Sequence, residues 1–154
     1  MGKLRVDSSK KLNFTKVANA VYKTLSQEED MYCEIVFMDE NEMQELNNST
    51  RNVNSVTDVL SFPSLDGIRN KVIYRKDYPF SCDGEELFIG SIVLCNQKIK
   101  SQAEELGHSE LRERTYLVVH GLMHLFGFDH IDEQDKKEMR QKEKEALAFL
   151  GIKE

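Results

Sequence analysis

The chain has 154 residues, 40% of them hydrophobic and 31% charged, which is typical of a soluble globular protein that forms a single domain over residues 1–154. No apolar run reaches the length of a membrane span, and the N-terminus lacks the apolar stretch of a secretory signal, so we expect neither membrane insertion nor export. Three widely spaced cysteines argue against a disulfide framework and indicate a cytoplasmic protein.

The net charge of −6 is unevenly distributed along the chain. Residues 1–24 carry six Lys or Arg and one acid, whereas residues 25–50 carry eight acids and no Lys or Arg. This asymmetry permits a local basic surface on an acidic protein. It also predicts weak non-specific binding to nucleic acid, because few phosphates would be neutralised.

The first part of the chain predicts short strands interleaved with two helices. Apolar side chains that recur every three or four residues indicate an amphipathic helix, and short apolar runs indicate strands. The expected elements are a strand at 3–6, a helix at 14–25, a strand at 33–38, a helix at 40–47 and a strand at 57–62. Asp39 is a plausible N-cap for the second helix. The turn-forming residues 47–54 predict a loop that contains Arg51.

Residues 64–86 look irregular and predict a hairpin or flap, with a possible short strand at 71–74. Cationic and aromatic side chains alternate in it, and they could hold RNA by charge and stacking or simply face solvent. These residues are Arg69, Lys71, Tyr74, Arg75, Lys76 and Tyr78.

The second part of the chain predicts one strand followed by three helices. The strand covers 87–94, and the helices cover 96–106, a central stretch that begins after Ser109, and a last stretch from Asp132 to about residue 150. Gly107 suits the left-handed end of the first of these helices. His108 follows it, and we expect a structural role for this histidine, as is common near a helix start. Together these elements predict an α+β fold in which about five helices pack on a mixed four-stranded sheet, with the central helix buried.

The central helix carries the strongest chemical signal, in the run TYLVVHGLMHLFGFDH at residues 115–130. His120 and His124 are four residues apart and therefore lie on the same helix face. Gly127 suits a left-handed turn that would bring His130 back toward this pair. Two imidazoles from a helix and a third from the following turn predict a three-histidine zinc site, although nickel, copper or cobalt would also suit these ligands.

Gly121 separates this pattern from that of zinc peptidases with the same histidine spacing. In those enzymes the residue after the first histidine is a glutamate that acts as the general base. Glycine can abstract no proton, so peptide hydrolysis by that route is disfavoured. A zinc site with three imidazoles still leaves a position open for a water molecule that the metal would activate.

The segment HGLMHLFGFDH resembles the signature of the YbeY family, bacterial metal-dependent endoribonucleases. Two further segments support the resemblance. One comprises Glu45-Leu46-Asn47, Arg51 and the run TDVLSFP at 57–63, and the other is Gly90-Ser91-Ile92-Val93. In the last segment Ser91 replaces the aspartate that is usual in the family, so a role for that carboxylate does not carry over.

The resemblance implies an α+β fold and a single-strand-specific endoribonuclease of ribosomal RNA maturation. Its expected tasks are processing of the small-subunit RNA 3′ end and ribosome quality control, with the small ribosomal subunit and its proteins as partners. The implied metal ligands are His120, His124 and His130. Arg51 matches the family's arginine, and its planar fork would suit the charge of a phosphodiester in the transition state. His120 is a second catalytic candidate, because it could transfer a proton as well as bind the metal.

Two alternatives remain open at the level of sequence. One is a different metal hydrolase, such as a peptidase or amidase with another base. The other is a non-catalytic ribosome-binding factor with structural zinc, for which Asp129, Cys95 or His108 would be the fourth ligand. Asp129 could instead orient a ligand histidine, or only shape the turn before His130.

Overall fold

The computed structural model describes residues 2–152 and confirms the α+β fold. The elements are β1 (Leu4–Ser8), α1 (Thr15–Thr24), β2 (Met31–Phe37), α2 (Glu40–Arg51), β3 (Val59–Pro63), β4 (Cys82–Asp83), β5 (Glu86–Leu94), α3 (Asn96–Leu106), α4 (Glu110–Leu125) and α5 (Glu133–Phe149). Two single 3-10 turns, η1 (Arg75–Asp77) and η2 (Pro79–Ser81), precede β4. The described residues thus form five helices, as expected, and a sheet with one short strand, β4, more than the four expected.

The sheet is mixed and is built around β5. The strand order is β1-β2-β5-β3, with β1, β2 and β5 parallel and β3 antiparallel to β5. β4 pairs with the beginning of β5, on residues that β3 does not reach. Because β5 has neighbours on both sides, its residues are almost continuously apolar, which is the pattern of a buried strand.

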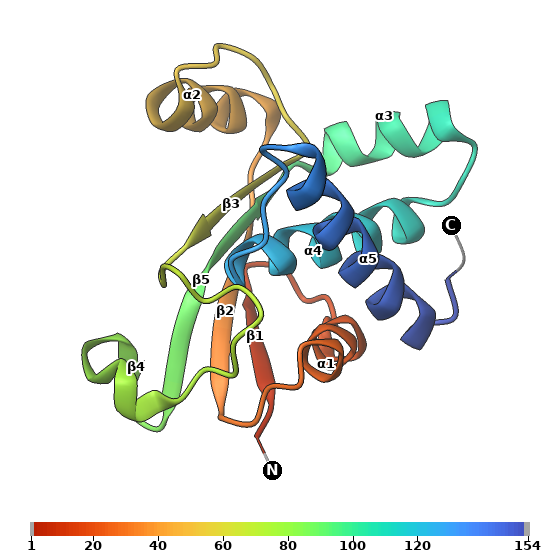
Figure 1. Cartoon of the computed structure of the whole chain (residues 1–154). Helices are drawn as coiled ribbons and strands as arrows, with labels where there is room; N and C mark the ends of the chain where they lie inside the picture. Colours follow the sequence, from red (N-terminus) through yellow and green to blue (C-terminus); the bar gives the residue numbers. More distant parts are fainter. Residues whose placement is uncertain (1, 153–154) are drawn as a thin grey trace.

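Helices α1 and α4 pack on one face of the sheet, and α5 covers them from outside (Figure 1). The core lies between these layers, and α4 is buried deeply in it. Gly121 of α4 faces Ile92 of β5 so closely that a Cβ atom there would lie 3.0 Å from Ile92 Cδ1. A second, smaller cluster joins α2 to the sheet through Met43, Leu60 and Val93. The central helix is therefore held against the sheet by close packing, and its histidines are fixed in position relative to that sheet.

The helix starts follow the capping residues that the sequence predicts. Asp39 forms a capping box with Glu42, and the Ser109 and Asp132 side chains accept hydrogen bonds from the backbone N–H groups three residues later. Gly107 adopts a left-handed conformation after α3, as expected. The starts of α1 and α3 differ from these, because their N-cap residues, Phe14 and Cys95, form no side-chain cap.

Three expectations for the first part of the chain are corrected. Helix α2 does not end at residue 47 but continues to Arg51, because Asn52 takes the left-handed conformation that ends it. Arg51 is therefore a helix-end residue and not a loop residue. The possible strand at 71–74 is wrong, since these residues pair with no strand.

The flap residues 64–86 are more firmly anchored than the sequence suggests. Arg69 donates to the Gly127 carbonyl and to Asp135, at 3.1 and 2.7 Å, and Arg75 forms an ion pair with Glu29 at 3.4 Å. These two arginines hold the flap to the body of the protein.

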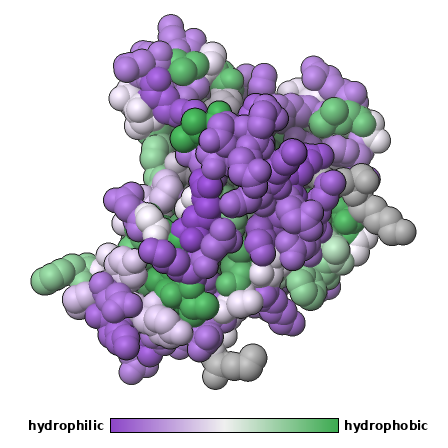
Figure 2. All heavy atoms as spheres, in the orientation of Figure 1, coloured by the Kyte–Doolittle hydropathy of each residue, from purple (hydrophilic) through white to green (hydrophobic). Residues whose placement is uncertain are grey.

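Within residues 2–152 none of the helices combines the length and the apolar character that crossing a bilayer requires. The face that α5 presents is mostly hydrophilic, with scattered apolar residues (Figure 2). The cysteines Cys33, Cys82 and Cys95 are all free thiols.

Candidate metal centre

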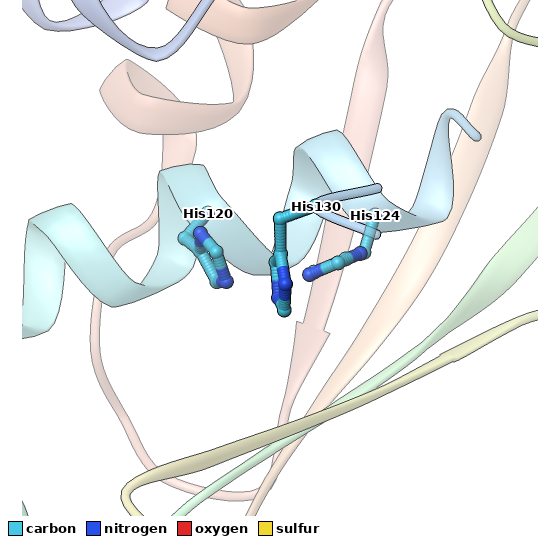
Figure 3. Close-up of side chains that lie close together, drawn as sticks. All are labelled: His120, His124 and His130. Atoms are coloured by element: carbon cyan, nitrogen blue, oxygen red, sulfur yellow. The ribbon is translucent and has the colours of Figure 1, made fainter. Parts of the chain in front are cut away.

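Three histidines that the sequence singles out lie together (Figure 3). His120 and His124 extend from successive turns of α4, and His130 reaches them from the segment after the helix. The ring centroids are 4.7 Å apart for His120 and His124, 5.7 Å for His120 and His130, and 5.1 Å for His124 and His130. One nitrogen from each ring lies within 4.8 Å of the other two. Metal–nitrogen bonds of about 2.0–2.1 Å are therefore within reach of small ring rotations.

The turn at Gly127 delivers His130 to the pair. The Gly127 and Phe128 N–H groups donate to the carbonyls of His124 and Met123, which closes the end of α4. Gly127 has a φ of +94°, a conformation that L side chains rarely adopt, and a Cβ atom there would lie 2.8 Å from the Arg69 backbone nitrogen. Both the turn and the close approach of the flap thus require glycine.

Substitution Gly127→Ala is expected to destabilise the protein by about 1–3 kcal/mol and to weaken metal binding, because relief of the strain and the clash moves His130. Thermal unfolding and metal titration measure the two effects. Gly84→Ala is the matched control, since Gly84 has a φ of +65° but nothing within 4 Å of the added Cβ atom. An equal loss of stability in both variants, with unchanged metal affinity in Gly127→Ala, would contradict the role of this turn.

His124 is held in the neutral form that a metal ligand requires. Burial lowers its pKa to about 4, and the nearby His120 and His130 act in the same direction. The charge of Asp129 and a hydrogen bond with the backbone of Phe128 oppose this shift but do not outweigh it. The imidazole lone pair of His124 is therefore available well below neutral pH.

Glu143 of α5 is a site residue that the sequence reading missed. Its Oε2 lies 2.6 Å from His120 Nδ1, and its side chain is only 3% exposed. A carboxylate can only accept, so Nδ1 carries the hydrogen and Nε2 keeps its lone pair for a metal. A signal was present in the sequence, because Glu143 falls on the narrow inward stripe of α5 with Met139, Ala146 and Leu147.

Substitution Glu143→Gln is expected to lower metal affinity by roughly 10–100-fold while the fold is retained, because glutamine still fits but no longer orients His120 with a charged acceptor. Competition with a chromophoric chelator measures the affinity. Glu105→Gln makes the same chemical change at an exposed position of α3 and should have no effect. If both variants bind metal as the wild type does, Glu143 does not position His120.

None of the three candidate fourth ligands joins the histidines in the described part of the chain. His108 contacts Glu113 at 2.8 Å, which agrees with the structural role expected for it. Cys95 is fully buried in the small cluster beneath α2. Asp129 accepts a hydrogen bond from the His130 N–H at 2.8 Å and so shapes the turn.

The donor set fits a catalytic rather than a closed metal site. Three protein ligands leave a coordination position open, and His130 is exposed while His120 and His124 are partly so. A divalent ion bound there would supply Lewis-acid activation of water and positive charge beside a phosphate. The chain's own contribution is to hold three converging imidazoles at an accessible surface.

The packing of Gly121 argues against the peptidase alternative. A side chain at this position would point into Ile92 of the sheet. Gly121 thus replaces the general base of the zinc peptidases with the same histidine spacing, and the packing leaves no room for a side chain there.

A partly buried polar network supports the segment before β3. Gln102 Nε2 donates to Asp58 at 2.8 Å and to Glu113 at 3.1 Å, and Glu113 also contacts His108. This network ties α3 and α4 to the strand that carries the TDVLSFP run.

Ser91 lies on β5 beside Glu34 of β2, so an acid in its place would bring two carboxylates together.

Unlike the other predicted site residues, Arg51 has no contact among the described residues that places it relative to the three histidines. It is exposed at the end of α2, and it makes no hydrogen bond or ion pair with any residue in the range 2–152.

Comparison with known proteins gives a consistent family assignment. The model of the family "Endoribonuclease YbeY" matches residues 3–151. A protein named endoribonuclease YbeY from Clostridium beijerinckii is 43% identical over 96% of this chain and 93% of its own length. One of the same name from Clostridium perfringens is 41% identical over 89% of this chain and 84% of its own length. The solution structure of TM1509 from Thermotoga maritima has the same fold, with a TM-score of 0.61 at 22% identity over 96% of this chain and 88% of that one.

Proposed function

The chain belongs to the YbeY family of endoribonucleases, and we propose that it cleaves single-stranded RNA with a divalent metal ion held by His120, His124 and His130. The observation that carries the proposal is the convergence of three imidazoles at an accessible surface, without a fourth protein ligand among the described residues. Zinc is the metal that this donor set suits best, and nickel or another divalent ion is the alternative.

The residues divide into ligands, a positioning group and a phosphate-binding group. His120 Nε2 is directed to the metal because Nδ1 faces Glu143, so His120 contributes to catalysis as an oriented ligand. Arg51 would bind the phosphodiester oxygens, because guanidinium matches phosphate geometry with two parallel hydrogen bonds.

The biological setting rests on the family resemblance. We propose that the whole chain, residues 1–154, acts as one domain in the cytoplasm and matures ribosomal RNA at the 3′ end of the small-subunit RNA. Ribosome quality control and binding to the small ribosomal subunit and its proteins belong to the same proposal. A net charge of −6 supports it, since weak general affinity for RNA favours cleavage that a partner directs.

Removal of the metal is expected to abolish cleavage of a labelled single-stranded RNA, and addition of Zn²⁺ should restore it. A chelator strips the ion, elemental analysis reports the metal content, and gel electrophoresis reports the cut RNA. A fully paired duplex of the same sequence is the matched control and should stay intact. Undiminished cleavage by protein that contains no metal would contradict the metal-dependent mechanism.

A further inference from the structure

The outer edge of β1 has no partner strand in the described part of the chain. The Met31 N–H donates to the Lys3 carbonyl, and the Ser9 N–H donates to the Ile35 carbonyl. In a parallel pair this pattern directs the backbone of odd-numbered β1 residues to β2. The backbone N–H and C=O groups of Leu4 and Val6 therefore point outward, where they can pair with another extended chain.

A groove runs along this open edge. A depression of about 630 Å³ is lined by residues 3–6 on one side and by residues 11–15 with Asn19 on the other. Four consecutive residues on the strand side show that the depression follows the edge and not one face of the sheet. A second depression, of about 740 Å³, shares Leu12, Asn13 and Phe14 with the first and continues toward the start of α4. We call the two together the β1 groove.

The β1 groove is cationic although the protein as a whole is acidic. None of the described residues that line it is Asp or Glu. The cationic side chains in the lining are Lys3, Arg5, Lys11, Lys16, Arg112 and Arg114. Arg5 is neutralised by Glu86 and Asp7, so the positive field comes mainly from Lys3, Lys11, Lys16 and Arg114. Such a field attracts acidic partners and opposes self-pairing of two copies of the edge.

The apolar part of the groove favours a protein segment over RNA. Leu12 and Leu111 are 37% and 63% exposed, whereas Phe14, the aromatic residue of the lining, is only 7% exposed. Single-stranded RNA binds on exposed aromatic rings, and aliphatic side chains offer no such platform. Aliphatic contacts within a cationic rim instead suit a peptide in which apolar and acidic residues alternate.

The groove and the metal centre lie on different sides of α4. Leu111 and His120 are nine positions apart, which is about 180° around the helix at 3.6 residues per turn. A segment bound in the groove would therefore leave the histidines accessible.

From the open edge, the groove and its charge, we propose that β1 receives an extended acidic segment of a partner protein, which adds to the sheet as a strand. Backbone hydrogen bonds to Leu4 and Val6 align the segment. Lys3, Lys11 and Lys16 contact its acids, and its apolar side chains fill the depression beside Leu12 and Leu111.

The test uses the full chain and a synthetic peptide in which Val or Ile alternates with Glu, labelled for fluorescence anisotropy. The wild type is expected to bind this peptide, but not a peptide in which Lys replaces Glu. Val6→Pro removes one outward N–H without touching the bonds to β2, and Lys11→Glu reverses one rim charge. Each should weaken binding by roughly tenfold. Lys137→Glu, on the exposed face of α5, is the matched control and should bind as the wild type does.

A second readout covers the case in which Val6→Pro does not fold. On peptide binding, the Leu4 and Val6 amides of the wild type should gain protection from hydrogen exchange. Cleavage of RNA should remain unchanged in Lys11→Glu, which separates this proposal from the metal-dependent function.

Three results would overturn the proposal. The first is no binding of the acidic peptide, or equal binding by wild type and Lys11→Glu. The second is loss of RNA binding in Lys11→Glu, which would make the groove an RNA surface. The third is a concentration-dependent dimer that protects the Leu4 and Val6 amides, which would make a second copy the occupant.

Discussion

His124→Ala is expected to abolish metal binding and RNA cleavage together. Burial lowers the pKa of His124 to about 4, and its ring centroid lies 4.7 Å from that of His120 and 5.1 Å from that of His130. Two ligands would remain, one of them on the exposed turn at His130, and such a pair holds zinc too weakly to survive purification. The metal content, measured by elemental analysis, should fall from about one metal per chain to a small fraction of that value.

The matched control for His124→Ala is His108→Gln. It removes the fourth histidine of the chain, and its amide can still donate to Glu113 in place of the imidazole. Metal content and cleavage should both stay at the wild-type level in this variant. If His108→Gln loses the metal, or His124→Ala keeps it, the site is not the one formed by His120, His124 and His130.

The metal centre could be predicted from the sequence wherever its geometry is local. The four-residue spacing of His120 and His124 sets their common face through the helix period alone, and a glycine such as Gly127 has few other uses directly after an apolar helix. Glu143 reaches His120 only through the packing of α5 on α4, a contact across 23 residues. No local rule predicts that contact, although a carboxylate on the buried stripe of α5 indicates that some buried partner exists.

The same difference between local and long-range contacts explains which predictions about the fold are confirmed and which are wrong. The caps at Asp39, Ser109, Asp132 and Gly107 are local and are confirmed. The sequence predicts too early an end for α2 because residues 47–51 have weak helix propensity, whereas in the structure Asn47 is buried and its side chain donates to the Ser55 carbonyl. That tertiary hydrogen bond ties the last turns of the helix to the following segment. In the flap, the sequence shows the cationic and aromatic side chains but not the anchoring ion pairs of Arg69 and Arg75, because their partners Asp135 and Glu29 are far away in the chain.

Arg51→Ala is expected to keep the metal and to lose cleavage, by roughly 10²–10³-fold in kcat if Arg51 stabilises charge in the transition state. The structure makes this substitution a clean test. Arg51 is exposed, and in the range 2–152 it makes no hydrogen bond or ion pair, so its removal leaves no partner unsatisfied. Thermal stability and metal content should therefore stay unchanged, and any loss of activity reports on the bound RNA.

Arg51→Lys separates the charge of this residue from its shape. Lysine keeps the positive charge but cannot form the two parallel hydrogen bonds that guanidinium makes with a phosphate. We expect an intermediate rate, with most of the loss in kcat rather than in KM, because the charge to be stabilised is greatest in the transition state. Equal rates for wild type, Arg51→Lys and Arg51→Ala would exclude Arg51 from the reaction. A rise in KM alone would make it a residue that holds RNA without taking part in bond cleavage.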